Sequence, residues 1–183
     1  TNNKKLSDKI KLLRENGIHS IKSKFKNLPY YPNYYEQVDS GFNFRMSEIS
    51  AALVNSQLKK LNFFVNKRNQ IAKTYLKLIK NPKFIFQDNN KDAKSSYHLF
   101  VVKLTNQNSN QYLKIFKIFN KNKIFINLHY KALHLNPFFE EMGFKKGQFP
   151  ISENYSYTAF SIPIFVGLEE KNIKKIISIL NNF

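Results

Sequence analysis

Apolar residues recur every three to four positions from about residue 46 to residue 80, and this spacing predicts a helical region with one face packed in a core. Asn62 is a suitable N-terminal cap for a second segment, so the region is expected to form two helices that meet near Leu61. Asn81 and Pro82 end the pattern, because a residue before proline disfavours helical backbone.

A shorter helix and a long loop precede this region. Ser7 can cap a helix that ends at Asn16-Gly17, because glycine readily takes the left-handed conformation that follows many helices. Residues 18–40 then form an aromatic loop with two prolines. Its length favours a role in binding or subunit contact, and a loop held on the domain surface by its tyrosines is the alternative.

The second half of the chain has a mixed pattern. Aromatic and β-branched residues predict strands at 97–104 and 124–128. Apolar spacing predicts helices at 110–120 and 169–181. Further expected elements are short helices at 137–142 and 151–159 and an extended piece at 161–164. This order of elements is that of a compact α+β unit.

The formal net charge of +18 suggests a polyanion-binding module as one possible function. The lysines are spread along the chain together with many asparagine, isoleucine and phenylalanine residues, as an A/T-biased coding sequence would produce. Arginine, the preferred residue for bidentate phosphate and base contacts, occurs only three times. We therefore expect no specific nucleic-acid partner, although salt-sensitive attraction to polyanions is expected.

Several kinds of chemistry are disfavoured by the sequence. Cysteine is absent, which removes disulfides and thiolate sites. His129 and His134 are five residues apart, not at the helical spacing of a metal pair, so no metal site is expected. The five glycines are isolated and form no phosphate-binding loop. No apolar run approaches the roughly 20 residues of a membrane span, and no signal peptide is visible, so we expect a cytoplasmic protein.

The stretch from Gly41 to Arg45 is the strongest candidate for a binding site. It places the amide of Asn43 and the guanidinium of Arg45 just before a helix, where free N–H groups and the helix dipole favour anions. The alternative is that Arg45 pairs with Glu48 on the first helical turn. Other polar groups also stand at segment ends and suit a phosphorylated ligand, namely His98, His129 and Tyr130.

Residues 34–49 contain a Gly-x-Asn-x-Arg block and resemble the DegT/StrS-type nucleotide-sugar aminotransferases, which are fold-type-I enzymes that use pyridoxal 5′-phosphate. The Tyr-Tyr-Glu-Gln sequence before this block is most similar to the members that act in pseudaminic-acid synthesis. The resemblance continues through most of the chain, at residues 51–53, 56–61, 67–68, 95–100, 129–134, 149–153 and 161–164.

This resemblance implies that the chain is the C-terminal half of such an enzyme. Residues 1–60 would be the end of the large cofactor-binding domain, and residues 61–183 the small C-terminal domain. The Schiff-base lysine of the family, and the carboxylate that holds the pyridine nitrogen, lie upstream of the matched part. We therefore expect no catalytic residue in this chain and no transamination by it alone.

The resemblance also implies a function. The substrate would be a UDP-linked 4-keto-6-deoxy-N-acetylhexosamine, with glutamate as amino donor, in surface-sugar biosynthesis. Asn43 would reach across a homodimer interface to the cofactor phosphate, and Arg45 would assist it or meet the nucleotide diphosphate. His129 and Tyr130 would lie near the nucleotide-sugar. A related 3-aminotransferase or a dehydratase of the same family remains an alternative.

Overall fold

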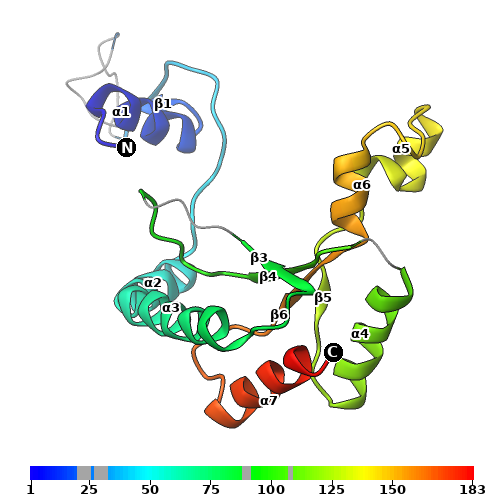
Figure 1. Cartoon of the computed structure of the whole chain (residues 1–183). Helices are drawn as coiled ribbons and strands as arrows, with labels where there is room; N and C mark the ends of the chain where they lie inside the picture. The colour runs from blue at the N-terminus through cyan, green and yellow to red at the C-terminus, as the bar shows by residue number, and fades with distance from the viewer. Residues whose placement is uncertain (20–25, 27–32, 88–91, 107–108) are drawn as a thin grey trace. The chain divides into compact units, whose positions relative to one another are not determined.

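The computed structural model describes residues 1–19, 26, 33–87, 92–106 and 109–183. The chain forms two compact units, Thr1–Lys59 and Lys60–Phe183, and each is described by itself. Figure 1 shows the elements of both units along the chain. None of the described helices is both long and apolar enough to cross a membrane.

The first unit begins with α1 (Lys4–Arg14), whose N-terminal cap is Asn3. The side chain of Asn3 accepts a hydrogen bond from the backbone N–H of Leu6 at 3.1 Å. The predicted cap at Ser7 is wrong, because the helix starts earlier and Ser7 already lies inside it. The predicted stop at Asn16-Gly17 is confirmed, since both residues adopt positive φ angles, 59° and 72°.

Two short strands lie inside the segment that the sequence predicts as a loop. β1 (Ile18–His19) pairs antiparallel with β2 (Glu36–Gln37). Most of the connection between them, including Tyr30 and Tyr31, lies outside the described residues. A role of this segment in binding or subunit contact therefore stays a prediction.

The helical region at 46–80 is two helices, as predicted. α2 (Glu48–Leu58) is capped by Ser47, whose hydroxyl accepts from the N–H of Ser50 at 3.2 Å. α3 (Leu61–Leu78) follows after a break at Lys59 and Lys60, so the predicted cap at Asn62 is wrong. Core packing is confirmed only for α3, because α2 has no buried residue in this chain.

The second unit is built on a four-stranded antiparallel sheet with the strand order β3-β4-β6-β5. Its strands are β3 (Phe84–Phe86), β4 (Phe100–Leu104), β5 (Asn127–Leu128) and β6 (Ala159–Ile162). The helices that pack with it are α3, α4 (Ser109–Lys121) and α7 (Glu170–Asn181). The predicted α+β class is confirmed, while β3 was not predicted.

The core of this unit lies between one face of the sheet and the three helices. Phe100, Val102 and Leu104 alternate along β4 and are almost fully buried, as a half-buried strand requires. Ring edges of the core aromatics meet, for example Tyr75 with Phe100 at 5.1 Å between ring centroids. The predicted inward residues of α7 are confirmed as buried: Ile173, Ile176, Ile177 and Leu180.

The strand predicted at 97–104 is paired only from Phe100, because the chain turns sharply before it. Tyr97 has a φ of 44°, which is unusual for a residue with a side chain. Two side chains of α3 hold the turn. Arg68 Nε donates to the carbonyl of Ser96 at 2.8 Å, and Asn69 Nδ2 donates to the carbonyl of Ser95 at 2.9 Å.

A small helical lobe connects β5 to β6. It contains a 3-10 turn, η2 (Leu133–Leu135), followed by α5 (Pro137–Glu141) and α6 (Pro150–Ser156). The short helix predicted at 137–142 is confirmed. The helix predicted at 151–159 ends at Ser156, because the chain enters β6 at Ala159.

One carboxylate, that of Glu153, connects several segments of this lobe by hydrogen bonds. Glu153 Oε1 contacts His134 Nε2 at 2.9 Å, and both side chains are buried. The same oxygen accepts the backbone N–H groups of Gly147 at 2.6 Å and Phe149 at 3.4 Å. The bond to His134, followed by these N–H groups, lowers the pKa of Glu153 despite its burial.

Candidate functional site

The stretch from Gly41 to Arg45 is an extended segment fixed against the end of α1. Asn43 forms an isolated antiparallel bridge with Glu15. The N–H of Phe42 donates to the carbonyl of Leu13 at 2.7 Å, and the N–H of Phe44 donates to the carbonyl of Arg14 at 3.2 Å. The segment that carries the predicted anion site therefore has a defined backbone position within its unit.

Two glycines allow this close approach of the backbones. A Cβ atom at Gly41 would lie 2.4 Å from the backbone nitrogen of Gly17 and 2.6 Å from the carbonyl oxygen of Leu13. A Cβ atom at Gly17 would lie 1.9 Å from the carbonyl oxygen of Asp39. All three distances are far inside van der Waals contact, so only glycine fits at either position.

Side chains alternate along the extended segment. The rings of Phe42 and Phe44 stack on each other with centroids 4.8 Å apart. Asn43 and Arg45 consequently project to the opposite side, since successive residues of a strand point to opposite faces. The amide and the guanidinium that the sequence singles out thus share one side of the segment.

Arg45 is paired with Glu15, its Nε lying 2.7 Å from Oε2 of the carboxylate. The expected alternative, an ion pair with Glu48, is wrong. Arg45 precedes the helix that contains Glu48, whereas the bridge between Glu15 and Asn43 brings the Glu15 carboxylate within reach. The sequence did not identify Glu15 as a site residue, although it stands directly before the predicted helix stop.

The residues of this segment fit a phosphate group. The side chain of Asn43 is exposed and makes no hydrogen bond to any described residue. The ion pair of Arg45 engages Nε, and its terminal amino groups are not bonded within the described part of the chain. An amide and a guanidinium on one side of an ordered backbone are suitable donors to phosphate oxygens.

His129 and Tyr130 follow directly after β5 in the second unit, and the peptide bond between them is cis. Their rings lie 4.3 Å apart between centroids, and the Tyr130 side chain is largely exposed. Burial lowers the pKa of His129, which favours the neutral form of its imidazole. Its Nδ1 atom is buried and has no hydrogen-bond partner among the described residues.

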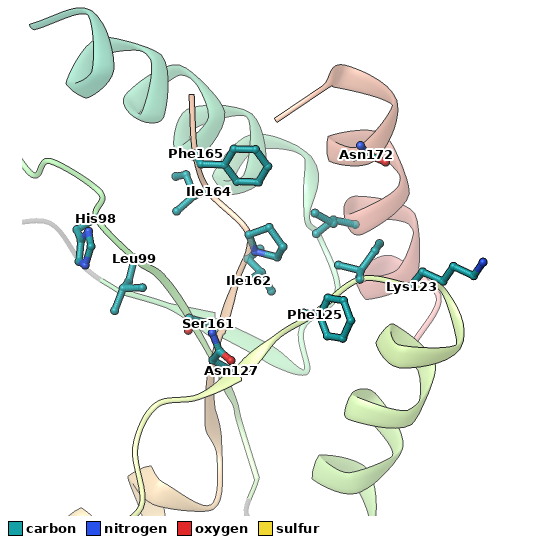
Figure 2. A pocket seen from close by; sticks show the side chains of 13 residues that line it. His98, Leu99, Lys123, Phe125, Asn127, Ser161, Ile162, Ile164, Phe165 and Asn172 are labelled. Atoms are coloured by element: carbon teal, nitrogen blue, oxygen red, sulfur yellow. The ribbon is translucent and has the colours of Figure 1, made fainter. Parts of the chain in front are cut away.

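A cavity of about 480 Å³ lies in the second unit, at the end of the sheet where β5 and β6 separate. Figure 2 shows His98 at one side of it and the side chains of Asn127 and Ser161 together at another. His98, which the sequence analysis groups with the polar residues at segment ends, is thus exposed at a cavity and is not part of the core.

The fold and these residues agree with the comparison to known proteins. The sequence pattern of the DegT/DnrJ/EryC1/StrS aminotransferase family matches residues 1–181. The chain belongs to this family, whose members are sugar aminotransferases that use pyridoxal phosphate. The resemblance that the Gly-x-Asn-x-Arg block indicated is confirmed.

Two related sequences illustrate the match. The UDP-4-amino-4,6-dideoxy-N-acetyl-β-L-altrosamine transaminase of Helicobacter pylori is 30% identical over 186 residues, covering 100% of this chain and 47% of the relative. The spore coat polysaccharide biosynthesis protein SpsC of Bacillus subtilis is 26% identical, covering 97% of this chain and 46% of the relative. The chain therefore spans about half the length of the relatives it matches.

Solved structures share the fold. Helicobacter pylori PseC, an aminotransferase of pseudaminic-acid biosynthesis, superimposes with a TM-score of 0.79 at 27% identity, covering 100% of this chain and 47% of that one. The sugar aminotransferase Spr1654 of Streptococcus pneumoniae superimposes with a TM-score of 0.80 at 18% identity, covering 100% and 44%. The predicted fold, half of a fold-type-I aminotransferase, is confirmed.

Proposed function

We propose that this chain forms the C-terminal part of a pyridoxal-phosphate-dependent transaminase in the cytoplasm. Its substrate is a UDP-linked 4-keto-6-deoxy-N-acetylhexosamine, glutamate is the amino donor, and the product enters surface-sugar biosynthesis. The relative at 30% identity, a transaminase named for a UDP-linked amino sugar, supports this substrate class. Within that protein, residues 1–60 belong to the large domain and residues 61–183 to the small domain.

The observation that carries the proposal is the ordered pair of Asn43 and Arg45. Asn43 donates its side-chain N–H to the cofactor phosphate of the partner subunit in a homodimer. Arg45, oriented through Nε by Glu15, directs its terminal amino groups to the same phosphate or to the nucleotide diphosphate. When bound, the cofactor supplies the electron sink that transamination needs.

His129 and Tyr130 are proposed to contact the nucleotide-sugar. A neutral imidazole with a free buried nitrogen can accept or donate one hydrogen bond, and the exposed Tyr130 ring offers an apolar face beside it. These 183 residues contain no segment that matches the Schiff-base lysine of the family. They therefore do not carry out transamination by themselves.

A second candidate is a 3-aminotransferase of the same family. It is favoured by the dTDP-3-amino-3,6-dideoxy-α-D-galactopyranose transaminase of Aneurinibacillus thermoaerophilus, which is 26% identical over 100% of this chain. The two candidates differ in the position of the keto group on the sugar. Supplying 3-keto and 4-keto nucleotide-sugars in parallel to the same enzyme distinguishes them.

The proposal is tested with the complete product of the gene that encodes this chain. We expect that product to bind pyridoxal phosphate and to transfer the amino group of glutamate to the 4-keto sugar, whereas these 183 residues alone do neither. Absence of a lysine followed by a glycine-rich stretch upstream of Thr1 would refute the proposal.

The role of Asn43 is tested by Asn43→Ala in the complete protein. Loss of one hydrogen bond to a charged phosphate corresponds to about 1.5–3 kcal/mol, so cofactor affinity should fall roughly ten- to hundredfold. Asn120→Ala, which removes the amide of an exposed asparagine on α4, is the matched control. Equal cofactor affinities of the two variants would show that Asn43 does not bind the cofactor phosphate.

A further inference from the structure

The cavity in the second unit exists because one strand pair ends early. β5 and β6 pair at Asn127 with Ser161 and at Leu128 with Phe160. Two residues further along this register, Phe125 would face Pro163. Proline has no N–H to donate, so the ladder cannot continue there, and the two segments separate around the cavity of about 480 Å³.

Hydrogen bonds hold both walls of the cavity in place. On one side, the hydroxyl of the fully buried Tyr75 donates to the carbonyl of Pro163 at 2.9 Å. On the other side, Lys175 Nζ donates to the carbonyl of Asn122 at 3.0 Å, and the N–H of Ile124 donates to the carbonyl of Phe119 at 3.0 Å. The cavity is therefore formed before any ligand arrives, as small-molecule sites usually are.

Polar side chains with unused hydrogen-bonding capacity line the cavity. His98, Asn127, Ser161 and Asn172 border it, and none of their side chains makes a hydrogen bond to a described residue. Figure 2 shows Asn127 and Ser161 beside each other, with His98 and Asn172 at separate places around the space. Each of the four groups can both donate and accept, because they are two amides, a hydroxyl and an imidazole.

Apolar groups complete the lining. Phe125 is 81% exposed and Phe165 is 52% exposed, although both belong to a unit with a large aromatic core. Ile162 and Ile176, which are almost fully buried in that core, also border the cavity. The cavity thus offers two aromatic faces and an aliphatic wall together with the four polar groups.

The charges around the cavity restrict the ligand. None of the described residues that line it carries a carboxylate to pair with a cationic ligand. Lys123 is the single charged residue among the described residues of the lining, and Figure 2 shows the end of this side chain directed away from the others. No arginine is present to hold a phosphate group. These features favour a neutral ligand that has both hydroxyl or amide groups and an apolar face.

We propose that this cavity is a binding site for a neutral sugar unit, such as an N-acetylhexosamine. A sugar ring places its hydroxyl and amide groups at its rim, where the four polar side chains can reach them, and its C–H face against Phe125 or Phe165. The choice of an N-acetylhexosamine rests on the proposed substrate class, whereas the cavity is independent of the cofactor contacts of Asn43 and Arg45, because it lies wholly within the unit Lys60–Phe183.

The test is a titration of the complete, isotope-labelled product of the gene that encodes this chain with N-acetylglucosamine, followed by NMR. We expect saturable shifts of the side-chain amides of Asn127 and Asn172 and of the His98 ring. Inorganic phosphate and UDP are titrated in parallel and should not cause saturable shifts of these groups. Shifts without saturation, saturable shifts confined to other residues, or tighter binding of phosphate or UDP in the cavity would overturn the proposal.

Two variants at exposed positions make the test more specific, since truncating these side chains does not disturb the core. Phe125→Ala and Asn127→Ala should each weaken N-acetylglucosamine binding about three- to tenfold, the effect of one lost contact or hydrogen bond. Asn120→Ala, which lies on α4 outside the cavity, should bind as the unchanged chain does. Unaltered affinity in both cavity variants would show that the sugar binds elsewhere.

Discussion

Glu15 orients the two residues of the proposed phosphate contact in different ways. Its backbone is bridged to Asn43, and its carboxylate binds Arg45 Nε at 2.7 Å. The second carboxylate oxygen is 3.1 Å from Arg14 Nε and 3.0 Å from an Arg14 terminal nitrogen. One residue at the end of α1 therefore fixes both the backbone and the side-chain geometry of this segment.

The ion pair between Glu15 and Arg45 is measurable in a double-mutant cycle. We expect Glu15→Gln and Arg45→Gln to show a coupling free energy of about 0.2–1 kcal/mol in urea unfolding at low salt, because both side chains are partly exposed and screened by water. The coupling should decrease at high salt. A cycle of Arg45→Gln with Glu48→Gln is the control and should show no coupling. Coupling of Arg45 with Glu48 and not with Glu15 would indicate that the ion pair forms within the helical turn instead.

Gly41 should tolerate no side chain. Gly41→Ala places Cβ against backbone atoms of Gly17 and Leu13, so the free energy of local unfolding should fall by more than about 2 kcal/mol. Hydrogen exchange of the Phe42 and Phe44 amides reports this change directly. Gly167→Ala is the matched control, because its nearest neighbour would be 3.8 Å away. Similar protection of those amides in both variants would contradict the close approach.

The buried contact between Glu153 and His134 should make stability depend on pH. The folded state holds the pKa of Glu153 below its ordinary value of 4.5. Its contribution is therefore fully present above pH 4.5 and is lost as the pH falls through the lower pKa of the folded state. Glu153→Gln should flatten this part of the curve of unfolding free energy against pH. Glu140→Gln, at an exposed carboxylate without an ion pair among the described residues, should leave the curve unchanged.

Removing the Tyr75 hydroxyl should have two effects. Tyr75→Phe leaves the carbonyl of Pro163 without its 2.9 Å partner, so the free energy of unfolding should fall by about 1–2 kcal/mol. The wall of the sugar cavity also loses its anchor, so N-acetylglucosamine should bind more weakly. Tyr112→Phe removes a comparable bond to the carbonyl of Ala159 at 2.8 Å, and it should lower stability without affecting sugar binding. Equal effects of both variants on sugar binding would show that the bond between Tyr75 and Pro163 has no specific role in holding the cavity wall.

The sequence predicted elements where the spacing of apolar residues is regular. α7 and α4 are long amphipathic helices, and their positions agree with the prediction to within one residue. The positions of helix starts were predicted less well, because Ser7 and Asn62 are suitable caps that the helices do not use. β3 has only three residues, which is too short for a strand pattern to be recognised.

The residues of the candidate site remain a prediction from the sequence, and their contacts were not predicted. The Gly-x-Asn-x-Arg block identified Asn43 and Arg45 and the family. The partner of Arg45 was missed, because Glu15 is distant in sequence and reaches Arg45 only through the backbone bridge to Asn43. The cavity was missed for a similar reason, since it depends on the end of a strand pairing at Pro163 and not on any local motif.

The alternation of side chains between Gly41 and Arg45 makes the length of this segment more critical than its composition. Deleting or inserting a single residue before Asn43 would turn the amide and the guanidinium to the side that the two phenylalanine rings now occupy. Substitutions at Phe42 or Phe44 would leave the polar pair facing the same way. In this chain, the number of residues between Gly41 and Ser47 therefore matters more for the direction of Asn43 and Arg45 than the identity of the two rings does.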